Sequence, residues 1–108
     1  MKRQFSGKYF EQAKHVMPGG VNSPVRSYPG LDLVPPVISR GQGPYVEDID
    51  GRRYLDFVLS WGPLILGHAP SCVQEAISNQ AALGTRFGAP TVGELELIQT
   101  IRSEEHTS

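Results

Sequence analysis

The stretch with the clearest capacity for chemistry is GGVNSPVR, residues 19–26. Its two glycines let the backbone turn sharply and come close to a ligand. Pro24 pushes the residue before it toward an extended conformation, so the Ser23 hydroxyl can project from the loop. The Arg26 guanidinium can grip a carboxylate through two parallel hydrogen bonds. Ser23 and Arg26 therefore form a candidate anion clamp, although spacing alone favours an ordinary turn with a surface arginine.

A second candidate is Trp61, the only tryptophan, which lies among small residues in SWGP, residues 60–63. An aromatic ring at the end of a strand could form the wall of a pocket. Spacing alone favours a tryptophan in the core. A third stretch, GTRFGAPT at 84–91, leads into a helix whose first amides could attract an anion. Helix capping explains Thr91 equally well.

The sequence contains no motif that favours a metal site or a nucleotide-binding site. His15, His68 and His106 are far apart, and His68 with Cys72 is a two-ligand pair that is weak evidence for zinc. A satisfied structural histidine and a buried cysteine are favoured there. DIDG at 48–51 indicates a hairpin turn rather than a calcium loop, because the other ligands are absent. There is no glycine-rich dinucleotide motif and no P-loop.

The elements that must position these residues follow from hydrophobic spacing and from turn residues. They are expected in this order: a helix over 4–17, an ordered loop over 21–36, an antiparallel meander with strands at 37–39, 45–48 and 53–58, a tight apolar connection over 60–69, a helix from Pro70 to Gly84, and a last helix that begins at Thr91 and is supported by a capping box with Glu94.

The chain of 108 residues is expected to be an incomplete part of a larger domain. The last helix has an apolar side, Leu95 to Ile101, that needs a partner this chain barely offers, and a chain this short buries only about 60–65% of its unfolded surface. We therefore expect residues 1–101 to be part of a larger domain. RSEEHTS at 102–108 resembles a translated sequencing adapter and is predicted to be non-native, the alternative being a polar helix end.

Composition limits the partners. Ten Lys and Arg against eleven Asp and Glu give a net charge of −1, without a basic run that would favour nucleic acid or an anionic membrane. Cys72 is the only cysteine, so the chain has no internal disulfide. The start shows no secretory signal, and no apolar run approaches the ~20 residues of a membrane helix. A soluble protein of the cytosol or of an organelle is expected.

Three stretches together resemble one protein family: VMPGGVNSPVR at 16–26, YLDFVLSWGPLILGHA at 54–69 and FGAPTVGELEL at 87–97. From about residue 5 to Ile101 they are similar to the amino-terminal part of the aminomutases among the class III PLP-dependent aminotransferases. The resemblance implies an α/β protein of PLP-dependent transferase fold type I. This chain would be its amino-terminal segment, made of a helix, a loop, a small antiparallel β-meander and further helices.

The resemblance also implies a function. The parent protein would be an isomerase that converts glutamate-1-semialdehyde to 5-aminolevulinate for haem and chlorophyll biosynthesis. It would use pyridoxal 5′-phosphate and pyridoxamine 5′-phosphate, and it would act as a homodimer in the cytoplasm, or in the plastid stroma of a plant or alga. Carried over by position, Ser23 and Arg26 would lie near the substrate carboxylate and Trp61 would line the same pocket. Asn22 and residues 88–91 extend this site less directly.

Two features set this sequence apart from a complete family member. Arg86 stands where the family usually carries a small residue such as serine. The cofactor needs a Schiff-base lysine, and the only lysines, Lys2, Lys8 and Lys14, lie in or before the first helix. No catalytic residue or cofactor anchor is therefore assigned, and the segment alone is expected to be inactive. The alternatives are a class III aminotransferase that uses an amine donor and a keto acid, and a small non-enzymatic interaction module.

Overall fold

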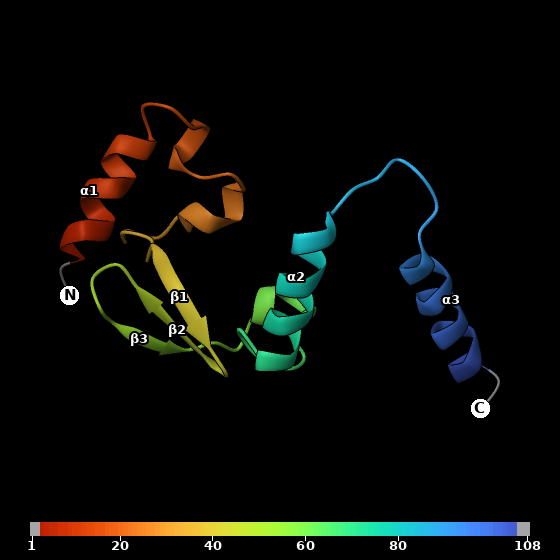
Figure 1. Ribbon diagram of the computed structural model, residues 1–108. Coiled ribbons are helices and arrows are strands. Elements are labelled where there is room, and N and C mark those ends of the chain that lie inside the picture. Colours follow the sequence, from red (N-terminus) through yellow and green to blue (C-terminus); the bar gives the residue numbers. More distant parts are fainter. Residues whose placement is uncertain (1–2, 106–108) are drawn as a thin grey trace. The chain divides into compact units, whose positions relative to one another are not determined.

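The computed structural model describes residues 3–105, which divide into two compact units, one up to Gln74 and the other from Glu75 (Figure 1). The first unit holds helix α1 (Gln4–Ala13), two short 3₁₀ turns η1 (Pro18–Gly20) and η2 (Pro24–Ser27), strands β1 (Ile38–Gln42), β2 (Tyr45–Asp48) and β3 (Arg53–Leu55), and a third 3₁₀ turn η3 (Leu59–Trp61). Helix α2 (Ser71–Leu83) crosses the boundary, and α3 (Val92–Glu105) lies in the second unit.

Helix α1 ends at Ala13, four residues before the predicted end at Met17. The amides of Val16 and Met17 still donate to the Ala13 carbonyl in a closing turn. Met17 itself is extended, at φ −132° and ψ 134°, because it precedes Pro18, whose ring disfavours the helical conformation in the residue before it. The helix end predicted at Pro18-Gly19-Gly20 is confirmed. The helix already stops before this segment, because Pro18 keeps Met17 out of the helical conformation.

The amino terminus of α1 is capped by a residue of the hairpin. Asp50 accepts hydrogen bonds from the Phe5 amide at 2.8 Å, from the Ser6 amide at 2.9 Å and from the Ser6 hydroxyl at 2.6 Å. Ser6 is fully buried. Burial alone would raise the pKa of Asp50, but the hydrogen bonds from Ser6 and Phe5 lower it overall. This carboxylate supplies the cap that α1 lacks locally, and it fixes the helix to the hairpin.

The predicted antiparallel meander is confirmed, with strand order β1-β2-β3 (Figure 1). Gln42 pairs with Tyr45 and Glu47 with Arg53. Its strand limits differ from the prediction, since β1 runs from 38 to 42 rather than over 37–39, and β3 ends at Leu55 rather than at residue 58. The early end of β3 has a local cause, which is the side chain of Asp56 described below.

The buried carboxylate of Asp48 holds the turn between β2 and β3 together through hydrogen bonds. Asp48 is 1% exposed, and it accepts hydrogen bonds from the Asp50 amide at 2.9 Å, the Arg52 amide at 2.9 Å and the Tyr54 hydroxyl at 2.7 Å. Burial alone would raise the pKa of Asp48, but these three hydrogen bonds together lower it. The hairpin predicted from Asp50-Gly51 is therefore held by a buried carboxylate as well as by turn geometry.

The apolar faces of the later helices are exposed. Ile77 on α2 is 64% exposed and Ile98 on α3 is 55% exposed. Among the aliphatic and aromatic residues at positions 3–103, only Ala13 and Pro35 are buried. Helix α3 continues past Ile101 to Glu105, while residues 106–108 of the predicted non-native tail lie outside the described range. Over residues 3–105, no helix combines the length and the apolar character needed to cross a membrane.

These exposed faces predict the behaviour of the isolated chain. We expect residues 1–108 alone to unfold in urea over a broad range, and to bind a hydrophobic dye at pH 7, because so little apolar surface is covered. Circular dichroism and dye fluorescence measure both. A sharp, reversible transition would contradict this expectation and would favour the small interaction module.

Candidate functional site

The glycine pair before the candidate clamp makes the sharp turn that the sequence predicts. Gly19 and Gly20 have φ of 67° and 73°, in the left-handed region that favours glycine. A Cβ on Gly20 would lie 2.8 Å from Cε2 of Phe10, so this backbone passes directly over α1. The two glycines therefore determine where the following loop begins relative to α1.

Ser23 and Arg26 lie on the same turn. Ser23 is extended, at φ −144° and ψ 128°, as predicted from Pro24, and its carbonyl accepts the Arg26 amide at 3.0 Å. The Ser27 hydroxyl closes the turn onto the Pro24 carbonyl at 2.8 Å. The Arg26 side chain is exposed, and within residues 3–105 its guanidinium makes no hydrogen bond, ion pair or ring contact. It is therefore available to an anion.

Trp61 lies in a strained turn. Leu59, Ser60, Trp61 and Gly62 all have positive φ, at 47°, 56°, 67° and 118°. For residues other than glycine this region costs of the order of 1 kcal/mol each. The Trp61 side chain is 80% exposed, so the core tryptophan that spacing alone favours is wrong. The apolar connection predicted over 60–69 is present as a loop, and it presents its tryptophan outward.

Asp56 organises the start of this loop. One carboxylate oxygen accepts the amides of Val58 at 2.8 Å and Leu59 at 3.1 Å, and the other lies 2.7 Å from Nε2 of His68. The hydrogen bond with His68, followed by those from the two amides, lowers the pKa of Asp56. An aspartate that bonds amides two and three residues ahead forms a turn instead of extending a strand, which explains why β3 ends at Leu55.

The structure also tests the metal-binding alternative. His68 is satisfied by Asp56, as expected of a structural histidine. Cys72, expected to be buried, is exposed. Over the described range, no three His, Cys, Asp or Glu residues gather closely enough to hold a metal ion.

The three predicted site residues are only partly brought together. Ser23 is the N-cap residue of η2, which contains Arg26, and η1 packs on α1, whereas Trp61 follows β3. Within residues 3–74, no hydrogen bond or ring contact joins Trp61 to Ser23 or Arg26. The candidate site therefore consists here of two separate parts, an exposed cation beside a hydroxyl and an exposed indole.

The stretch 88–91 belongs to the second unit and is a helix start. The Thr91 amide donates to the Glu94 carboxylate at 3.3 Å, which is one half of the predicted capping box. The Phe87 ring covers Gly84, where a Cβ would lie 2.8 Å from the ring. Arg86 borders an open hollow of about 790 Å³ beside this loop. Helix capping accounts for the Thr91 contact, and the extension of the site to residues 88–91 stays a prediction.

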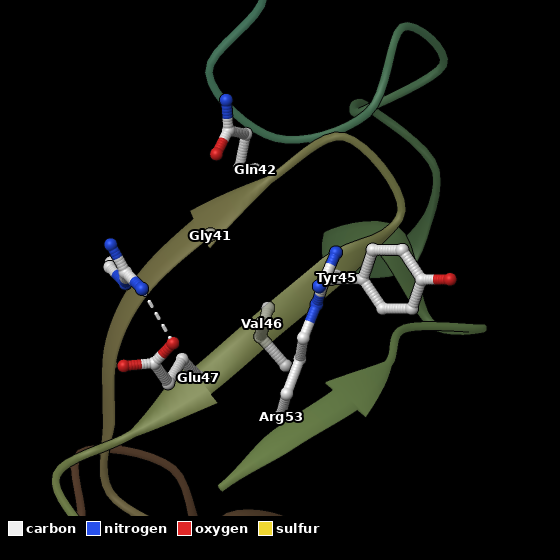
Figure 2. Close-up of a pocket in the computed structure, with 7 residues that line it drawn as sticks. Gly41, Gln42, Tyr45, Val46, Glu47 and Arg53 are labelled. Atoms are coloured by element: carbon white, nitrogen blue, oxygen red, sulfur yellow. Dashed lines mark hydrogen bonds and ion pairs between the residues drawn. The ribbon is translucent and has the colours of Figure 1, made fainter. Parts of the chain in front are cut away.

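A small hollow of about 120 Å³ lies on the sheet between β1, β2 and β3 (Figure 2). Arg40 pairs with Glu47 at 2.7 Å on one side, and the Arg53 guanidinium stacks 3.7 Å from the centre of the Tyr45 ring on the other. Both arginines already have partners within the sheet. This hollow is therefore a weaker anion site than the unpaired Arg26.

The described lysines do not suit a Schiff base. Lys8 is exposed on α1, and Nζ of Lys14 pairs with Glu11 at 2.7 Å and lies 5.4 Å from the centre of the Phe10 ring. Lys2 lies outside the described range, and the absence of an anchor lysine from this segment stays a prediction.

Comparison with known proteins gives one consistent result. The family model "Aminotransferase class-III" matches residues 29–103. A curated protein named glutamate-1-semialdehyde 2,1-aminomutase 2, from Listeria monocytogenes, is 54% identical over 96 residues, which are 89% of this chain and 22% of that protein. The chain thus spans about a fifth of the length of the curated relatives it matches.

Two solved structures show the fold. An omega-transaminase from Sphaerobacter thermophilus matches with a TM-score of 0.74 and 39% identity, over 83% of this chain and 20% of that one. A glutamate-1-semialdehyde aminomutase variant from Pseudomonas aeruginosa PAO1, in complex with PMP, matches with a TM-score of 0.74 and 30% identity, over 84% of this chain and 20% of that one. The arrangement of helix, loop, meander and helices is therefore shared with larger enzymes.

Proposed function

The chain belongs to the class III aminotransferase family, and on that basis we propose that it is the amino-terminal segment of a glutamate-1-semialdehyde 2,1-aminomutase. The parent enzyme would convert glutamate-1-semialdehyde to 5-aminolevulinate in tetrapyrrole biosynthesis, as a cytoplasmic homodimer. The observation that carries this proposal is the 54% identity to the Listeria relative, which extends over most of this chain.

Arg26 and Ser23 would hold the substrate through its carboxylate. A guanidinium without a partner among residues 3–105 can form two parallel bonds to that group, and Ser23 lies at the start of the same turn. The substrate is a small acid, so a single grip of this kind also fixes its orientation. Trp61 would cover the bound substrate and exclude water, because its indole is exposed and ready to pack on a ligand.

The cofactor of the proposed enzyme is pyridoxal 5′-phosphate, which would supply the amino-transfer chemistry when bound. In this proposal its anchors belong to the remaining four fifths of a protein as long as the Listeria relative. The positions of the two described lysines support this, since Lys8 is exposed and Lys14 is paired with Glu11. This segment contributes substrate-binding groups.

A second candidate is a class III aminotransferase that takes an amine donor and a keto acid. The specific observation in its favour is the omega-transaminase structure, which is more similar in sequence to this chain, at 39%, than the aminomutase structure is, at 30%. The curated aminomutase at 54% identity outweighs it.

A chimera tests the proposal directly. The 96 matched residues of this chain would replace their counterparts in the Listeria relative, and the corresponding segment of the Sphaerobacter omega-transaminase would be grafted in the same way as a control. We expect the first chimera to form 5-aminolevulinate from glutamate-1-semialdehyde without an added amino acceptor, and the control chimera to fail. A folded first chimera that needs a keto acid, or that forms no product, would refute the aminomutase proposal.

The glycine pair gives a further prediction in this chimera. Gly20→Ala is expected to raise KM for glutamate-1-semialdehyde about tenfold, because the added Cβ clashes with Phe10 and displaces the loop that carries Arg26. Gly30→Ala is the matched control: it also has positive φ, at 85°, but meets no atom within 4 Å. Steady-state kinetics of both variants measure this, and equal effects would show that backbone strain alone is responsible.

A further inference from the structure

The loop from Asp56 to His68 is closed at its base by a single side-chain pair. Oδ2 of Asp56 and Nε2 of His68 are 2.7 Å apart, and the two side chains are only 14% and 20% exposed. Trp61 lies between them in sequence and is 80% exposed, and Phe57, next to Asp56, is also exposed. The ion pair is therefore shielded, while the aromatic residues of the loop face outward.

Both ends of this loop are also bonded to the turn between β1 and β2. The Asp56 amide donates to the Pro44 carbonyl at 2.8 Å, and His68 exchanges two backbone hydrogen bonds with Gly43, at 2.8 and 2.9 Å. Gly41 leaves room for the imidazole, since a Cβ there would lie 2.6 Å from Cγ of His68. The ring is thus seated against the sheet in one position.

The second oxygen of Asp56 stabilises the strained part of the loop. It accepts the amides of Val58 and Leu59, at the start of the run of positive φ that contains Trp61. Such a run persists only where surrounding contacts impose it. One carboxylate therefore links the closure of the loop to the conformation that presents the indole.

We propose that Asp56 and His68 are positioning residues, which keep this loop closed and thereby fix Trp61 where it contacts the substrate. This inference rests on the proposed aminomutase function. Loss of the pair would let the loop sample other conformations, so the indole would meet the substrate in only a fraction of molecules. The effect would fall mainly on substrate binding, and hence on KM, because neither residue contacts a reacting atom.

His68→Phe in the chimera is the decisive variant, since it keeps a ring against Gly41 and removes the bond to Asp56. We expect amide hydrogen exchange to rise about tenfold over residues 57–62 and to stay unchanged over the hairpin, residues 48–54. KM should rise about tenfold, with kcat changed by less than about threefold. His68→Gln, which can still donate to Asp56, should restore most of both properties. His15→Phe, at an exposed histidine outside the loop, should match the unsubstituted chimera.

The outcomes separate this inference from the function on which it rests. An active chimera whose His68→Phe variant shows unchanged exchange over residues 57–62, or unchanged KM, refutes the positioning role. If the unsubstituted chimera forms no 5-aminolevulinate, the aminomutase proposal fails, and the exchange of residues 57–62 still decides whether the pair holds the loop closed. If His68→Phe does not fold, the same exchange and KM measurements on His68→Gln and His68→Ala replace those on His68→Phe.

Discussion

Replacing Arg26 with methionine in the chimera is expected to lower kcat/KM for glutamate-1-semialdehyde about 100-fold. Methionine keeps much of the side-chain length and removes both donors of the proposed carboxylate clamp, each worth ~1.5 kcal/mol to a charged acceptor. Together they correspond to about two factors of ten. Steady-state kinetics measure the change, and most of it should appear in KM, because the carboxylate does not change charge during the reaction.

Two further variants make this prediction specific. Arg26→Lys retains the charge but not the two parallel donors. Its kcat/KM should therefore be only about tenfold higher than that of Arg26→Met. Arg40→Met removes an arginine from the sheet, where it forms an exposed ion pair with Glu47, and should leave the kinetics unchanged. If Arg26→Met retains full activity, or if Arg40→Met is equally impaired, the carboxylate is held elsewhere.

The second large effect concerns stability. Asp48→Ala is expected to lower the free energy of unfolding of the chimera by about 3 kcal/mol, because it leaves the Asp50 and Arg52 amides and the Tyr54 hydroxyl without their buried acceptor. Urea unfolding at pH 7 measures it. Asp32→Ala, at an exposed aspartate in the loop before β1, is the matched control and should have little effect.

The same carboxylate should make stability depend on pH. The pKa of Asp48 is lowered in the folded state, so its ionised form stabilises the fold at pH values above the ordinary aspartate pKa of about 3.9. This contribution is lost as pH falls through the folded-state pKa. Asp48→Asn should therefore flatten the decline in unfolding free energy between about pH 5 and pH 2. An unchanged acid profile would show that Asp50 and Asp56, whose pKa values are also lowered, carry the effect.

Local signals in the sequence predicted the order of the elements well. Asp50-Gly51 marked the hairpin, alternating residues marked the strands, and Pro18-Gly19-Gly20 marked the end of the first helix. These signals act within a few residues, so the sequence alone suffices to read them. The extended conformation of Ser23 belongs to the same class, since it follows from the adjacent Pro24.

The errors arose where a side chain acts at a distance or replaces a regular element. Asp50 accepts the Phe5 amide of a helix 45 residues earlier, which no local pattern reveals. Asp56 looked like a continuation of the third strand, but its carboxylate bonds the Val58 and Leu59 amides and ends the strand. The left-handed run that exposes Trp61 was missed because three of its four residues are not glycine. The pairing of Asp56 with His68 could have been suspected only from the complementary residue types.

The distant cap on α1 has a consequence for biosynthesis. The helix has no acidic residue in its first turn, and its own N-cap residue makes no side-chain hydrogen bond. A ribosome that adds ~5–20 residues per second needs roughly 2–9 s to produce the 45 residues between Phe5 and the aspartate that caps it. Helix α1 therefore gains its cap only after Asp50 has been made, and a nascent chain stalled before residue 50 would expose Phe5 and Tyr9 to chaperones.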